Sequence, residues 1–373
     1  MVQVLLENIH KTYLGADDPE ARKRPALDDV SLEIATGETL SVVGPSGCGK
    51  STLLKIVAGL EFPEKGRVLY NGHDVTRVEP QQRGVGMVFQ DYALYPAMKS
   101  RGNLQYYFEI RQRTQEQMEQ RVREVADMMG VGFEMLLGQM PTTLSGGEQQ
   151  RVAIARCIGR EPTVFLMDEP ISNLDAKLRE RTRVEIKKML RQFGISTLYV
   201  THDQQEAIFM GDRIAVLREG KLEQVGTFDD LYFKPVNIFV ATFIGAPPMS
   251  ILQGEIAGHA LSLGPALRFD IPADLASALP QGAVRIGVRP EGWVLRESSA
   301  DGVPVAVTLV ERIPTQQAAF IRGALAGARV TVLGPLNYPD SERVFVAPDW
   351  DQIYVFASDN EAVLHVPDVP DLF

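Results

Sequence analysis

A glycine-rich stretch between an expected strand and an expected helix constrains this chain more than any other feature. An apolar run over residues 39–43 reads as a buried strand, and residues 53–58 predict a helix that ends at Gly59. This is the context that the phosphate-binding pattern G-x-x-x-x-G-K-[ST] requires, so a chance glycine turn is the weaker interpretation. The residues of the stretch are Gly44, Pro45, Ser46, Gly47, Cys48, Gly49, Lys50, Ser51 and Thr52.

The pattern carries a definite chemistry. Its glycines let backbone N–H groups curl around phosphate oxygens, and the N-terminus of the following helix adds a favourable dipole. Lys50 is expected to reach the β- and γ-phosphates of a nucleotide, and Ser51 to place its hydroxyl on Mg²⁺. The stretch alone would fit many kinds of nucleotide-binding enzyme.

Size and composition narrow the class of protein. The 373 residues suffice for two or three domains, and a net charge of −10 argues against nucleic acid as a partner. The only two cysteines, Cys48 and Cys157, provide no disulfide framework and fit a reducing compartment. The first residues do not look like a signal peptide, and no apolar run approaches the roughly 18 residues of a membrane span. We therefore expect a soluble, cytoplasmic, multidomain protein.

A second motif, LSGGEQQR, begins at Leu144. Ser145 with Glu148 three positions later is a capping-box pattern that opens a helix over residues 149–158. A capping box alone is a common structural feature. Gly146 and Gly147, however, are costly just inside a helix, and they favour a backbone that approaches an anionic ligand closely.

Paired acids form a third motif. Residues 164–167 predict a buried strand that ends at Asp168 and Glu169, where α/β sheets bind ligands. One acid suits Mg²⁺ and the other the activation of a water molecule, although such acids can also form a turn or a helix cap. His202 follows the next buried strand in the same way, which favours function over the structural role that a lone histidine usually has.

The remaining patterns indicate an α/β domain built around the phosphate loop. Alternation and turn signals predict strands over residues 2–9, 26–34, 66–70 and 85–89, with a surface loop at 15–25 and a hairpin turn at Asn71-Gly72. Residues 101–138 and 177–193 read as helical. In the first of these, Met118, Val122, Val125 and Met129 share one face, which indicates packing.

Taken together, these motifs resemble the ATPase subunit of an ATP-binding cassette (ABC) transporter over residues 2 to about 235. The resemblance implies a P-loop NTPase fold with a mixed sheet in domain 1–235 and a helical subdomain at about 91–158. It implies ATP and Mg²⁺ as cofactors. The roles it implies are adenine stacking by Tyr13, sensing of Mg²⁺ and water by Gln90, Mg²⁺ binding by Asp168, general base catalysis by Glu169, a dimer contact by Asp175 and γ-phosphate sensing by His202.

The resemblance also implies partners. The family acts as a head-to-tail dimer, in which the Ser145–Gly147 segment of one copy closes on ATP bound to the other. We therefore expect a second copy, integral membrane permease subunits and, indirectly, an extracytoplasmic solute-binding protein. The chain itself would be peripheral, at the cytoplasmic face of the inner membrane.

Residues 172–179, 243–249 and 287–291 narrow the match, because they resemble importer ATPases for sugars, maltooligosaccharides and glycerol phosphate. Those proteins carry a small regulatory barrel of the oligonucleotide-binding (TOBE) type. Short alternating runs punctuated by Gly and Pro predict such an all-β domain over 236–373. Sugar is the first expectation for the solute. Glycerol phosphate, polyamine, a non-transport ABC ATPase and a regulatory protein stay open.

Departures from the family pattern affect three segments. The loop at 15–25 is long, Arg101-Gly102-Asn103-Leu104 replaces the usual segment after Gln90, and residues 312–317 replace a glycine turn in the barrel. Glu148 stands where Gln is common, and it keeps the capping box.

Overall fold

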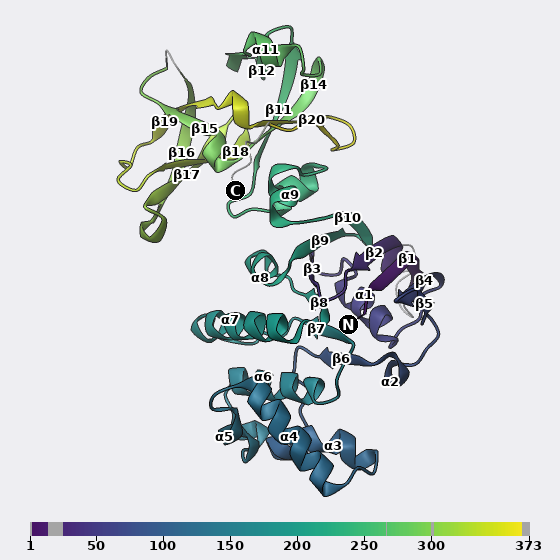
Figure 1. The fold of residues 1–373 in the computed structure, drawn as a ribbon. Coiled ribbons are helices and arrows are strands. Elements are labelled where there is room, and N and C mark those ends of the chain that lie inside the picture. The colour runs from purple at the N-terminus through teal and green to yellow at the C-terminus, as the bar shows by residue number, and fades with distance from the viewer. Residues whose placement is uncertain (1, 14–24, 266, 300–301, 368–373) are drawn as a thin grey trace. The chain divides into compact units, whose positions relative to one another are not determined.

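The computed structural model describes residues 2–13, 25–265, 267–299 and 302–367, so most of the expected loop at 15–25 lies outside the described residues. The chain divides into two compact units, Met1–Val225 and Gly226–Phe373. Figure 1 shows helices and strands mixed in the first and mainly strands in the second. The functional boundary at 235/236 stays a prediction.

An antiparallel sheet opens the first unit, in the order β2-β1-β4-β5. Asn71 and Gly72 join β4 to β5 with φ of 48° and 77°, the pair of positive values that an Asn-Gly hairpin turn favours. The strands are β1 Val4–Lys11, β2 Leu27–Ile34, β4 Lys65–Tyr70 and β5 His73–Asp74.

The second sheet carries the phosphate loop. Its order is β10-β9-β3-β8-β7-β6, and β3, β6, β7, β8 and β9 run parallel. Every residue of β3 and β8 is buried, as expected for central strands covered on both faces. The strands are β3 Thr39–Val43, β6 Val85–Val88, β7 Val164–Asp168, β8 Ser196–Val200, β9 Arg213–Arg218 and β10 Lys221–Gly226.

Helices complete the first unit. Residues 101–138 form three helices rather than one helical stretch, because Thr114 opens a new helix with a capping box and Gly130 and Gly132 interrupt it afterwards. The expected apolar face is confirmed, since Met118, Val122, Val125 and Met129 are all buried. The helices are α1 Lys50–Ala58, α2 Pro80–Arg83, α3 Ser100–Ile110, α4 Gln115–Met129, α5 Phe133–Leu137, α6 Gly146–Ile158, α7 Ala176–Phe193 and α8 Gln204–Met210.

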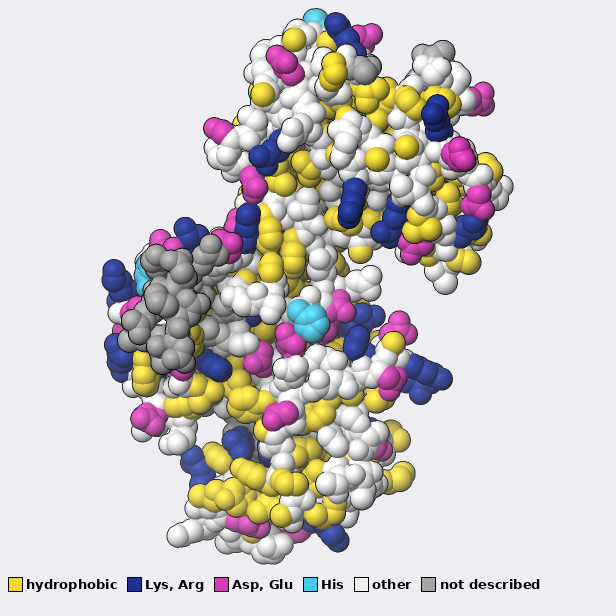
Figure 2. All heavy atoms as spheres, turned by 180° about the vertical axis from the view of Figure 1, so that it is seen from behind, with side chains coloured by type: hydrophobic (Ala, Val, Ile, Leu, Met, Phe, Trp, Pro, Cys, Tyr) yellow, Lys and Arg dark blue, Asp and Glu magenta, His cyan; other side chains and the backbone are white. Residues whose placement is uncertain are grey.

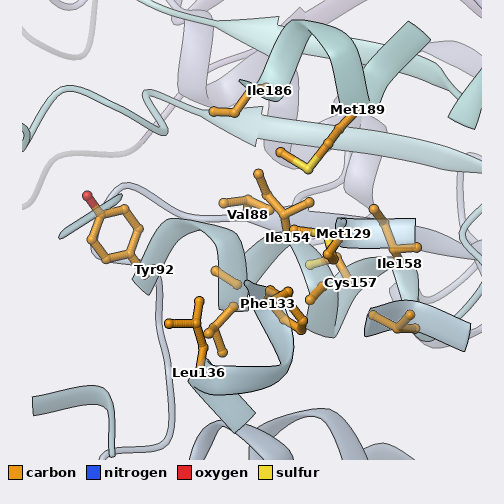
Figure 3. Packing of buried hydrophobic residues seen from close by; sticks show 14 of the residues in the cluster. Val88, Tyr92, Met129, Phe133, Leu136, Ile154, Cys157, Ile158, Ile186 and Met189 are labelled. Atoms are coloured by element: carbon orange, nitrogen blue, oxygen red, sulfur yellow. The ribbon is translucent and has the colours of Figure 1, made fainter. Parts of the chain in front are cut away.

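One core of this unit joins α4, α5, α6 and α7 to β6 and β7. Figure 3 shows Ile186 and Met189 of α7 on one side of this cluster and Met129, Phe133 and Leu136 on the other, with Ile154 of α6 between them. α6 is therefore packed on several sides.

The second unit is mainly β around a large core and a smaller cluster, in agreement with the small barrel domain that was expected. Its two antiparallel sheets have the orders β13-β12-β11-β14-β20-β21 and β15-β19-β16-β17-β18, and residues of both sheets share the core. The strands are β11 Ser250–Ala257, β12 Ala260–Leu263, β13 Leu267–Asp270, β14 Gly282–Val288, β15 Trp293–Arg296, β16 Val303–Ile313, β17 Ala318–Leu325, β18 Ala328–Pro335, β19 Arg343–Pro348, β20 Ile353–Ala357 and β21 Val363–His365. Three short helices accompany them: α9 Phe228–Phe233, α10 Ile238–Phe243 and α11 Ala273–Ala276.

Among the residues that the structure describes, no helix is both long and apolar enough to cross a membrane.

Candidate nucleotide site

The phosphate loop connects β3 to α1 in a conformation that needs glycine. Gly49 caps α1 with φ of 108°, and a Cβ on it would lie 2.3 Å from the carbonyl oxygen of Ala26. A Cβ on Gly44 would lie 2.2 Å from the carbonyl oxygen of Leu217. A side chain at either position would therefore displace the loop.

Lys50 lies inside the loop. Its side chain is buried, and its amine donates hydrogen bonds to the carbonyl oxygens of Gly44 at 2.8 Å and Pro45 at 3.0 Å. Pro45, Ser46 and Gly47 are exposed. The cation is thus held beneath an accessible loop, where it can meet a phosphate.

Cys48 and Thr52 complete the loop region. The Cys48 thiol is 3% exposed, and this burial raises its pKa. The thiol therefore stays protonated at neutral pH. Thr52 is half-buried in the first turn of α1. Neither side chain presents a charge to the loop.

The structure brings together Ser51 and Asp168, two of the three residues predicted for Mg²⁺, the third being Gln90. The Ser51 hydroxyl donates to Oδ1 of Asp168 at 3.4 Å, although the two residues are far apart in sequence. Burial, and then the neighbouring Glu169 carboxylate, raises the pKa of Asp168. A cation bound beside Asp168 would stabilise its charged carboxylate and so oppose both causes of the raised pKa.

Glu169 and His202 form the next pair, directly after the adjacent strands β7 and β8. His202 Nδ1 lies 3.0 Å from Oε2 of Glu169, and the Glu169 backbone N–H donates to the carbonyl oxygen of Val200 at 2.9 Å. Glu169 has φ of 46°, which is uncommon for a residue other than glycine. The strand ends therefore hold the acid against the imidazole, a contact that the sequence did not predict.

Gln90 lies in a turn directly after β6. The turn is closed by a hydrogen bond from Tyr92 N–H to the carbonyl oxygen of Phe89 at 3.0 Å. Asn173, which follows the paired acids, donates from its amide to the carbonyl oxygen of Gln90 at 2.9 Å. This bond links Gln90 to the segment that carries Glu169.

Tyr13 follows the end of β1, which lies beside the phosphate loop. Lys11 of that strand pairs with Leu27, next to the Ala26 carbonyl that touches Gly49. The Tyr13 ring is 42% exposed, and the Lys11 amine lies 5.3 Å from its centre.

The motif at Ser145 opens α6, as predicted. The Glu148 carboxylate accepts hydrogen bonds from the Ser145 N–H at 2.8 Å and hydroxyl at 2.7 Å, and these bonds lower its pKa. A Cβ on Gly146 would lie 2.5 Å from the Leu174 side chain, and one on Gly147 would lie 3.1 Å from Leu178. Packing against the start of α7 is thus a second reason for the two glycines, one that the sequence did not reveal.

This segment belongs to a different part of the unit from the phosphate loop. Within the described residues, no hydrogen bond or ion pair joins the segment Ser145–Glu148 to Gly44–Thr52. Asp175 caps α7 by accepting from the Leu178 N–H at 2.9 Å. The structure thus gathers Lys50, Ser51, Asp168, Glu169 and His202 into one site and leaves the other motif outside it.

Sequence reasoning missed a buried carboxylate behind His202. Glu206 accepts hydrogen bonds from the hydroxyls of Tyr199 and Thr201, and Thr201 Oγ1 also accepts from the Asp203 N–H at 3.1 Å. Burial is the main reason why the pKa of Glu206 is raised. The only signal in the sequence is an acid four residues after His202, which is meaningful once α8 is known to begin there.

A phosphate loop between a parallel strand and a helix, with acids and a histidine at the ends of the neighbouring strands, defines a P-loop nucleotide hydrolase. The sequence profile of ABC transporters matches residues 27–172. Together with the relatives below, it shows that the chain belongs to the ATP-binding proteins of ABC transporters.

Two relatives cover nearly the whole chain. The sn-glycerol-3-phosphate import ATP-binding protein UgpC 3 of Rhizobium etli is 42% identical over 338 residues, which are 90% of this chain and 93% of the relative. The UgpC protein of Brucella abortus is 42% identical over 371 residues, 97% of this chain and 99% of the relative.

A solved structure supports the fold of the first unit. The ATP-binding cassette MJ0796, in a dimeric post-hydrolysis state with ADP and phosphate, matches with a TM-score of 0.52 and 33% identity. The match covers 60% of this chain and 98% of that chain. The expected family, α/β fold and ATPase activity are confirmed.

Proposed function

We propose that this chain is the ATPase subunit of an importer, and that its nucleotide site is completed by a second copy. The observation that carries the proposal is the gathering of Ser51, Asp168, Glu169 and His202 around the phosphate loop. These are the groups that ATP hydrolysis needs, held at the ends of adjacent parallel strands.

The residues present fit Mg²⁺. Ser51 and Asp168 supply hard oxygen ligands 3.4 Å apart, and Mg²⁺ in nucleotide sites takes one or two protein oxygens together with phosphate oxygens and water. Among the described residues, no group of three or more His, Cys, Asp and Glu could hold a metal ion, so such a site would depend on the nucleotide. When bound, Mg²⁺ neutralises charge on the β- and γ-phosphates.

The chain's own residues divide the chemistry between them. Lys50 neutralises charge on the γ-phosphate, and Glu169 orients the attacking water and accepts its proton. His202, in contact with Glu169, binds the γ-phosphate from the end of the adjacent parallel strand β8. Tyr13 stacks on the adenine, and Gln90 responds to the water and the metal.

A head-to-tail dimer completes the site. Ser145–Gly147 presents backbone N–H groups at the start of α6, and we propose that they bind the γ-phosphate held by the other copy. Asp175 contributes to the same contact from the start of α7. The solved relative MJ0796 is dimeric, which supports this arrangement.

A groove in the first unit suits a permease segment. It has a volume of about 820 Å³ and is lined by aromatic side chains, among them Phe89, Tyr95 and Tyr107. Three arginines also line it: Arg111, Arg156 and Arg160. Figure 2 shows hydrophobic side chains, with Lys and Arg nearby, gathered towards the end of the unit that carries the helices. We propose that a cytoplasmic segment of the permease docks here, with the chain peripheral at the inner membrane.

The solute proposed is sn-glycerol-3-phosphate. The resemblance of the motifs alone puts a sugar first, whereas the names of the relatives at 42% identity put glycerol phosphate first. An extracytoplasmic solute-binding protein would deliver it. The ATPase need not touch the solute.

Reconstitution tests this function. The chain is combined in membrane discs with its permease and solute-binding protein, and phosphate release is measured with sn-glycerol-3-phosphate, maltose or a polyamine. We expect hydrolysis to rise several-fold only with the binding protein loaded with sn-glycerol-3-phosphate.

Each other outcome identifies a different protein. Stimulation by maltose or polyamine would replace the solute and keep the importer. Hydrolysis that is indifferent to permease, at full rate, would favour a regulatory or non-transport ATPase and contradict the proposal. A disc with Lys50→Ala supplies the background.

A further inference from the structure

The turn that holds Gln90 adopts a conformation that its own residues do not favour. Tyr92 has φ of 63° and Ala93 φ of 47°, two consecutive residues other than glycine in the left-handed region. Such residues persist there only when surrounding contacts hold them. The contacts that hold this turn therefore decide where Gln90 lies.

One side chain supplies the contacts to both strained residues. Arg156 Nη1 donates to the carbonyl oxygen of Ala93 at 2.7 Å, and Nη2 donates to that of Tyr92 at 3.2 Å. Its guanidinium also lies 5.4 Å from the centre of the Tyr95 ring. Both terminal nitrogens of the planar guanidinium thus donate to backbone carbonyl oxygens of the turn.

Arg156 is itself held firmly. It lies on α6 and is 8% exposed, and burial lowers the pKa of its guanidinium without removing the charge. The Tyr92 ring lies at one edge of the core cluster that contains Ile154 of the same helix (Figure 3). Both the arginine and the residue it binds are therefore anchored by packing.

The position of Arg156 links two regions of the proposed function. The side chain lines the groove proposed for the permease, together with Ala93 and Tyr95 of the bound segment. On the other side, the turn continues into Gln90, which Asn173 ties to the segment of Glu169. A group docked in the groove would touch the residues that fix Gln90.

We propose that Arg156 is a positioning residue for Gln90. By binding the carbonyl oxygens of Tyr92 and Ala93, it sets the position of Gln90 at the nucleotide, and it transmits the occupation of the groove to that site. The inference rests on the proposed function, because it assumes that Gln90 acts in hydrolysis.

A double-mutant cycle on the full chain tests this role. Steady-state hydrolysis is measured without permease for wild type, Arg156→Lys, Gln90→Ala and the double variant. A lysine keeps the charge but cannot donate to two carbonyls in the same fork geometry. Arg156→Gln, which retains a donor without the charge, is measured alongside in case the lysine variant folds poorly.

Arg121→Lys is the matched control. Arg121 on α4 also binds two carbonyl oxygens, those of Gly159 at 3.0 Å and Ile158 at 3.2 Å, at the C-terminal end of α6. Its Nη1 also pairs with the carboxylates of Glu124 at 2.8 Å and Glu161 at 3.1 Å, which a lysine can still meet, and it is not among the residues that line the groove. Its replacement measures what the loss of such a clamp costs in stability alone.

The expected result has three parts. Arg156→Lys lowers kcat roughly tenfold while the KM for ATP stays within about twofold, because a displaced group near the reaction slows the chemistry more than binding. The double variant is no slower than Gln90→Ala, since both changes act through one group. Arg121→Lys keeps wild-type kinetics.

Three results would overturn the proposal. These are full turnover in Arg156→Lys and Arg156→Gln, losses that multiply in the double variant, or an equal loss in Arg121→Lys. Failure of solute to stimulate hydrolysis in discs would count against the importer function instead, and it would leave the kinetics of the free chain as a valid test of Arg156.

Discussion

Glu169 is the residue whose surroundings say most about hydrolysis. Its carboxylate contacts His202 at 3.0 Å, its backbone is tied to β8, and its carbonyl oxygen accepts from the Ser172 hydroxyl at 2.9 Å. Such fixation is what positions a general base for one water molecule.

Replacing this carboxylate should stop turnover and preserve ATP binding. We expect Glu169→Gln to lower kcat by roughly 10²–10⁴-fold, because an amide cannot accept the proton of the attacking water. Lys50 and the phosphate loop are untouched, so nucleotide affinity should stay unchanged. Phosphate release and equilibrium binding of labelled ATP measure the two effects. Wild-type turnover in this variant would exclude Glu169 as the base.

At the scale of elements, a buried carboxylate lies where β8 leads into α8. Glu206, on the first turn of α8, receives hydrogen bonds from Tyr199 and Thr201 of the β8 region. The raised pKa of Glu206 means that the folded state binds more protons here than the unfolded state. This position therefore loses stabilising free energy as pH rises from the unfolded pKa, about 4.3, through the higher folded pKa.

Glu206→Gln should remove that dependence on pH. We expect the free energy of unfolding of the variant to increase relative to that of wild type as pH rises from about 4 to 8, because wild type loses stability over this range and the amide does not ionise. Urea titrations across this range measure it. Glu206→Leu is the control: like the amide it does not ionise, but it leaves the buried Tyr199 hydroxyl unpaired, so it should be about 1–3 kcal/mol less stable than Glu206→Gln at all pH values. A constant difference between Gln and wild type would contradict the assignment.

The elements also differ in how well local sequence patterns predict them. The phosphate loop and the acids after β7 follow from local patterns, because each needs only a strand and what comes directly after it. The division of residues 101–138 into three helices depends on Thr114 and two glycines, which a periodicity count overlooks. The clamp from Arg156 to Tyr92 joins residues 64 positions apart, and no local pattern predicts it.

At the scale of the whole molecule, the residues predicted for the nucleotide all lie in the unit Met1–Val225, and Gly226–Phe373 has a core of its own. Separate cores permit separate unfolding transitions. A ligand stabilises only the unit that binds it.

Calorimetry should therefore show two transitions, of which ATP and Mg²⁺ move one. With the Glu169→Gln variant, which would keep ATP intact, a concentration of 100 times Kd should add about 2.7 kcal/mol to the first unit. For a unit of this size, that corresponds to a rise of roughly 5–10 °C in its Tm. Thermograms with and without nucleotide, and with Lys50→Ala as the control, measure it. Equal shifts of both transitions would contradict independent units.

The helix α6 carries two functional features, one near each end. Its first turn carries the motif at Ser145, and Arg156 lies eleven positions on, about 16 Å away along a rigid axis. In a head-to-tail pair, one end of the rod would touch the neighbour's nucleotide while the other holds the Gln90 turn of its own copy. The two nucleotide sites would then be coupled through α6, because ATP bound to one copy would affect the position of Gln90 in the other. A tilt of this one helix would then act on both sites at once.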